Sequence, residues 1–127
     1  MKKLTAILCL TLAVLLGSAG VSWSADFQKG LDAYKKKDYA TALREWKPLA
    51  EQGNGEAQYN LGVMYYRGQD VIQDNVNAMM WGAIAAANGY KDGTKLFNSL
   101  SKGMTSSARS ALQIVVEEYI RKKYKGC

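Results

Sequence analysis

Three observations predict an all-α fold of about three stacked helix pairs. Apolar residues recur at helical spacing through most of the chain, and no run alternates apolar and polar residues long enough to suggest a strand. Glycine, asparagine and aspartate separate the helical segments, because the 127 residues include a single proline. A pattern that begins at Asp38 also returns at Asp74, which indicates an internal repeat.

The first 24 residues have the order of a secretory signal peptide. Lys2 and Lys3 precede an apolar run at residues 4–16, and the small residues Ser22 and Ser24 stand just before Ala25. The run is too short for a membrane span, which needs about 20 residues. We therefore expect a signal peptide at residues 1–24, cleavage before Ala25, and a bacterial protein that is periplasmic or secreted.

The remaining residues, 25–127, are expected to form one helical repeat domain. Apolar spacing and helix-ending residues predict helices at 26–36, 39–52, 55–67, 75–88, 92–102 and 106–124. Asp38 and Thr105 have side chains suited to N-caps, and Gly53 and Gly89 are suited to end helices. The helix at 75–88 is apolar or small on all sides, which predicts that it lies in the middle of the stack. The last helix is expected to pack through Ala108, Ala111, Leu112, Val115 and Tyr119, widened by Val116 and Ile120.

The repeat places small residues at matching positions 36 residues apart. Ala42, Ala50 and Gly53 correspond to Ala78, Ala86 and Gly89. A period of this length holds one helix–turn–helix unit. One such unit cannot bury its apolar face alone, so neighbouring units are expected to stack.

Residues 42–93 resemble the Sel-1-like repeat family, which is related to tetratricopeptide repeats. The resemblance is carried by AEQG at 50–53, AQYNLGVMYY at 57–66, AMMW at 78–81 and AAANG at 85–89. The resemblance implies a right-handed α-solenoid that serves as a scaffold or adaptor for protein complexes. Asp70 stands where the family usually has glycine, which predicts a distorted loop, and Gly93 replaces an expected alanine, which predicts a weaker helix. The paired cysteines of many relatives are missing, so no disulfide between helices is carried over.

Catalytic side chains are scarce. The chain has no histidine, which excludes Ser-His and Cys-His nucleophile systems and zinc sites built on histidine. We therefore expect no enzyme activity, no metal site and no cofactor. After cleavage, Cys127 would be a lone thiol, which suggests an intermolecular disulfide, a free reactive thiol or an incidental terminal residue.

The candidate site is a small concave groove that binds a peptide or helix of a protein partner. The resemblance implies that the first helix of each pair lines this groove, and tyrosine and arginine are enriched at interface hot spots. The groove residues we expect are Tyr34, Tyr59, Val63, Tyr66 and Arg67. The alternative is that these tyrosines pack between repeats, since helical stripes are more often core than site.

Export argues against a nucleic-acid partner, and no integral membrane segment is expected in residues 25–127. Three other readings stay open. The protein could be a structural subunit that forms a homodimer through Cys127, a cell-envelope hydrolase, or a membrane-surface protein that uses its basic final helix.

Overall fold

A computed structural model describes residues 25–124. Its helices are α2 (Phe27–Lys35), α3 (Tyr39–Glu51), α4 (Gly55–Arg67), α5 (Asn75–Ala87), α6 (Asp92–Leu100), the 3-10 turn η1 (Ser101–Gly103) and α7 (Ser106–Tyr124). These bounds lie within a few residues of the predicted ones, and the predicted all-α solenoid is confirmed. The predicted signal peptide and Cys127 lie outside the described residues.

Side-chain caps start most of these helices. Asp26, Asp38, Asn54 and Asp74 each accept a hydrogen bond from a backbone N–H of the first turn, as in Ala57 N–H to Asn54 Oδ1 at 2.9 Å. Thr105 caps α7 as predicted, since its Oγ1 accepts from the Ala108 N–H at 3.2 Å. Each cap satisfies a donor that the helix itself leaves unpaired.

Four helices end in the same way, with a left-handed residue and a backbone bond that spans five residues. The left-handed residues are Lys37, Gly53, Gly68 and Gly89. The bonds run from the N–H of Asp38 to Ala33, Asn54 to Leu49, Gln69 to Met64 and Tyr90 to Ala85. The same turn geometry therefore follows each of these helices, including the turns at Gly53 and Gly89 that the sequence repeat pairs.

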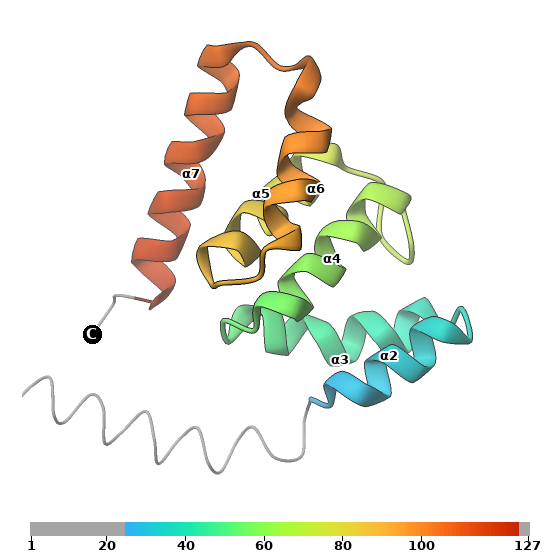
Figure 1. The fold of residues 1–127 in the computed structure, drawn as a ribbon. Helices are drawn as coiled ribbons and strands as arrows, with labels where there is room; N and C mark the ends of the chain where they lie inside the picture. Colours follow the sequence, from blue (N-terminus) through green and yellow to red (C-terminus); the bar gives the residue numbers. More distant parts are fainter. Residues whose placement is uncertain (1–24, 125–127) are drawn as a thin grey trace, which may run out of the picture.

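Neighbouring helices pack on one another from α2 and α3 at one end of the molecule to α7 at the other (Figure 1). The first core cluster joins α2, α3 and α4 through the buried residues Ala33, Ala42, Trp46, Ala50, Ala57, Leu61 and Met64. Helix α5 contacts α4, α6 and α7, which confirms that it lies in the middle of the stack. Its alanines and glycine allow these close approaches because they carry little or no side chain.

The third helix pair is more open than the first two. Helix α7 packs mainly on α5 rather than on α6 (Figure 1). Leu112 and Val116 are its buried residues. The ring of Tyr119 meets that of Trp81 edge-on, with the ring centroids 6.0 Å apart. Three residues of the predicted packing stripe, Ala108, Ala111 and Val115, are exposed instead. The stripe is rotated because α7 leans on α5, and the sequence of α7 alone carries no information on that direction.

Candidate functional site

A hollow of about 240 Å³ lies where α2, α3 and α4 meet. Four of the five groove residues predicted from the sequence line it: Tyr34, Tyr59, Val63 and Arg67. The other lining residues are Leu31, Trp46 and Asn60. The first helices of two successive pairs thus supply most of the wall, and the tryptophan comes from the helix between them.

Trp46 forms the base of this hollow and is held rigidly. Its indole is 2% exposed, and its Nε1–H donates to the carbonyl of Phe27 at 3.2 Å. The ring also lies 5.8 Å from the ring of Phe27 and 5.5 Å from that of Tyr34. Gly30 leaves the space for it, since a Cβ at that position would lie 2.5 Å from Trp46 Nε1. The base of the hollow is therefore preformed.

A polar rim closes one side of the hollow. Arg67 Nη1 donates to the Tyr34 hydroxyl at 3.1 Å, and that hydroxyl donates to Gln69 Oε1 at 2.9 Å. These bonds join α2 to the end of α4 and to the loop that follows. The Arg67 side chain is exposed, and within residues 25–124 it forms no ion pair. Its positive charge is therefore available at the rim.

Tyr59 stands on the other side and packs against Tyr90, with the ring centroids 5.3 Å apart and the ring planes tilted by 45°. Burial raises the pKa of Tyr90, and the nearby carboxylates of Glu56 and Asp92 raise it further. Tyr90 therefore stays neutral well beyond physiological pH. The pair links the hollow to the turn between α5 and α6.

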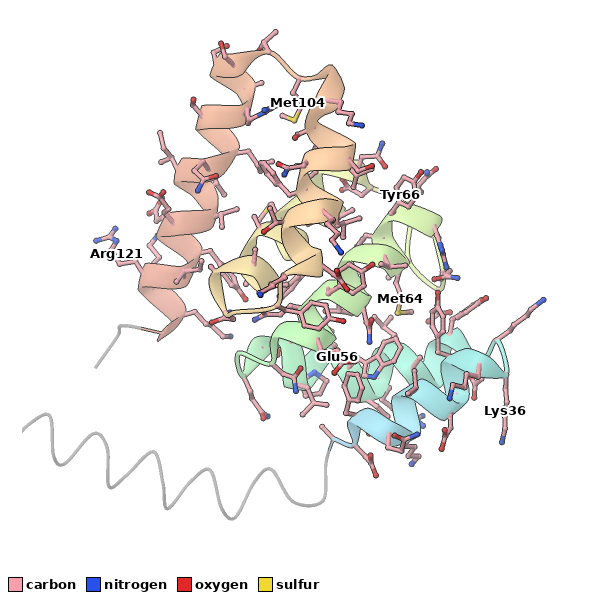
Figure 2. The ribbon with its side chains drawn as sticks, viewed as in Figure 1. Lys36, Glu56, Met64, Tyr66, Met104 and Arg121 are labelled. Atoms are coloured by element: carbon pink, nitrogen blue, oxygen red, sulfur yellow. The ribbon has the colours of Figure 1, made fainter. Side chains whose placement is uncertain are left out.

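Tyr66, the fifth predicted groove residue, does not line the hollow. It is 43% exposed and points outward from the C-terminal half of α4 (Figure 2). The residues of α4 that line the hollow are Tyr59, Asn60, Val63 and Arg67. Compared with the predicted face of α4, the lining face is therefore rotated away from Tyr66 towards Asn60. Leu31 and Asn60 could have been found by extending the faces of Tyr34 and Tyr59 by one neighbour. The sequence did not mark Trp46 as a lining residue, because an apolar residue on α3 is expected to belong to the core.

The lining offers little chemistry for catalysis. None of the seven side chains around the hollow is a carboxylate, a serine or a cysteine. Across residues 25–124, no three His, Cys, Asp or Glu side chains gather in a way that could hold a metal ion. No helix in that range is long and apolar enough to cross a membrane.

Comparison with known proteins identifies the central repeat. Residues 55–90 match the family model of the Sel1 repeat, and they comprise α4, α5 and the loop that joins them. Comparisons with curated proteins and with solved structures gave no match. Sel1 repeats generally mediate protein–protein interaction. Residues 55–90 thus match a Sel1 repeat, and this segment supplies four of the seven residues around the hollow.

Proposed function

We propose that this protein is an exported, non-catalytic interaction module that binds a short peptide or one helix of a protein partner. The binding site is the hollow between α2, α3 and α4. The observation that carries the proposal is the meeting of Tyr34, Tyr59, Val63 and Arg67 around a buried tryptophan. Aromatic and arginine side chains with a preformed base are the composition of an interface hot spot.

The size of the hollow supports a peptide rather than a small molecule. Its volume of about 240 Å³ is below the usual range for drug-sized ligands, which is roughly 300–1,000 Å³. A space of this size accommodates one or two side chains of a partner. The absence of a carboxylate, serine or cysteine among the lining residues also speaks against a hydrolase at this place.

Peptide display on the protein without residues 1–24 tests the proposal. Selected peptides should bind the parent and lose binding to a Tyr59→Ala, Val63→Gln double variant, because both changes remove apolar walls of the hollow. Tyr66→Ala is the matched control, since Tyr66 lies on the same helix outside the hollow. Circular dichroism and thermal unfolding should show that both variants remain folded.

Three outcomes are informative. Loss of binding in the double variant with retention in Tyr66→Ala supports the hollow as the site. Loss in Tyr66→Ala alone would place the site on the outer face of α4. Peptides that bind all three proteins equally would remove the hollow from consideration.

A second candidate, a structural subunit that dimerises, is favoured by one observation on α7. Ile114 is 64% exposed and Val115 is 48% exposed on the outer face of this terminal helix. Cys127 follows three residues after the end of α7. Light scattering and non-reducing gels of the parent, a Cys127→Ser variant and an Ile114→Lys, Val115→Lys variant would test it. A monomer under all conditions would exclude this candidate.

A further inference from the structure

We infer that the hollow selects partner segments in which an apolar residue is flanked by acidic side chains. The inference rests on the proposed function, because it names the chemical class of segment that the same hollow receives. It depends on the sign of the charge around the hollow and on one side-chain amide that has no hydrogen bond among the described residues.

The interior of the hollow is largely apolar. Leu31 of α2 and Val63 of α4 line it together with the indole of Trp46. The volume of about 240 Å³ suits a single side chain such as leucine. Burying such a side chain contributes the apolar share of the binding free energy.

The charge on the lining of the hollow is positive. Arg67 is the charged residue of the lining, and no lining residue is acidic. A guanidinium has five N–H donors, and the structure assigns one of them to the Tyr34 hydroxyl. The remaining donors can bind a carboxylate in the two-pronged geometry that arginine favours.

Further positive charge beside the hollow favours acidic side chains over a single terminal carboxylate. Tyr34 is followed directly by Lys35, Lys36 and Lys37, which are exposed. None of the three forms an ion pair within the described part of the chain. Lys35 follows Leu31 by one helical turn and so lies on the face of α2 that lines the hollow, whereas Lys36 lines a separate hollow with Asp32 and Asp38. A segment with more than one carboxylate complements Arg67 and Lys35 together better than one terminal group does.

A side-chain amide in the lining can bind the backbone of the partner. Asn60 lines the hollow, and its side-chain amide has no hydrogen bond with any residue in the range 25–124. An amide offers donors and an acceptor together, which is the complement of a peptide bond. Asn60 can thus hold the main chain while the apolar residue enters the hollow and the acidic ones meet Arg67 and Lys35.

Three capped hexapeptides test the inference by nuclear magnetic resonance titration of the ¹⁵N-labelled protein without residues 1–24. They are acetyl-Gly-Glu-Leu-Glu-Glu-Gly-amide, the same peptide with glutamine for each glutamate, and the acidic peptide with glycine for leucine. We expect the first to shift the amides of Tyr59, Asn60 and Val63 with a Kd about five- to tenfold lower than the other two, as a few partly exposed charge pairs allow. Raising NaCl from about 0.05 M to about 0.5 M should reduce that advantage, because salt screens exposed charges.

Two variants complete the design. Arg67→Gln should remove most of the preference for glutamate while leaving the leucine contribution. Arg121→Gln is the matched control, because Arg121 lies on α7 at the opposite side of the molecule from Lys36 (Figure 2). Equal loss in both variants would mean that net charge, and not the rim of the hollow, attracts the peptide, and would overturn the inference.

The outcomes separate this inference from the proposed function. Equal affinity for the glutamate and glutamine peptides, with shifts at the same amides, would overturn the acidic preference and leave peptide binding in place. Equal affinity with and without leucine would overturn the apolar anchor. If no hexapeptide shifts these amides, the inference is wrong, and the display selection decides the proposed function on its own.

Discussion

Gly93 lies where α6 crosses α5 and leaves no room for a side chain. A Cβ at this position would overlap the carbonyl oxygen of Gly82 and lie 2.7 Å from the Ala86 nitrogen. We therefore expect Gly93→Ala to lower the free energy of unfolding by about 1–3 kcal/mol, although alanine is the better helix former. Urea unfolding followed by circular dichroism measures this. Gly103→Ala is the control, since nothing lies within 4 Å of its added Cβ, and equal effects of the two changes would contradict the explanation.

Sequence reasoning judged Gly93 and Asp70 by local preference alone. It treated Gly93 as a weak point of its helix, whereas the close contact with Gly82 gives the missing side chain a structural reason. Asp70 was expected to distort its loop, and it adopts φ 59°, the left-handed conformation that glycine would adopt without cost. The sequence marked both positions as unusual, but only the tertiary contact or the backbone angle explains them.

Lys37 ends α2 in a conformation that suits glycine better. Its φ is 63°, and the equivalent helix-ending residues Gly53 and Gly89 have φ of 99° and 92°. The left-handed region costs a residue with a Cβ roughly 1–2 kcal/mol, so we expect Lys37→Gly to raise the stability of the fold by up to about 1 kcal/mol after the entropy of the unfolded chain is included. Thermal and urea unfolding measure the change. Lys36→Gly should give no gain, because Lys36 has a negative φ of −85°.

At the scale of single helices, the sequence predicts where a helix begins and ends better than it predicts which of its faces is buried. Helix ends depend on local chemistry, such as the cap at Asp74 or the left-handed Gly89, and these can be read from a few residues. The buried face of α7 and the lining face of α4 are each rotated from the predicted one. Ala108 and Tyr66 are exposed in consequence. Those rotations are set by neighbouring helices, which a single helical pattern does not describe.

The cap of α5 predicts a dependence of stability on pH. Backbone N–H groups of Asn77 and Val76 and the Asn77 side chain donate to Asp74, and these bonds lower the pKa of its carboxyl below the usual 3.8. Because the pKa of Asp74 is lower in the folded state than in the unfolded state, its carboxylate stabilises the fold at pH values above the unfolded-state pKa. This stabilisation is lost as the pH falls through the folded-state pKa. We expect the free energy of unfolding to drop below about pH 4, and to drop less steeply in Asp74→Asn. Urea unfolding at about pH 7 and about pH 3 compares the two proteins, and parallel losses would contradict a role for Asp74.

On the scale of the whole molecule, stability should vary along the stack. Repeat proteins are held together by contacts between neighbouring units, so each helix depends on how many neighbours it has. Helix α5 is covered on three sides, whereas α7 rests mainly on α5 and leaves Ile114 64% exposed. The hollow lies among α2, α3 and α4, away from the open third pair, so its preformed base does not depend on α7.

Hydrogen exchange tests this gradient directly. We expect the backbone amides of α7 to exchange through local opening with a lower free energy than those of α4 and α5, which should approach the free energy of global unfolding. A Val116→Ala variant should lower the protection of α7 most, because Val116 is 2% exposed and is one of the few buried residues that hold this helix. Uniform protection from α3 to α7 would contradict the gradient and would mean that the third pair unfolds together with the rest. Where only α7 opens early, the partner-binding hollow stays intact, and a folded site can coexist with a loosely docked end of the solenoid.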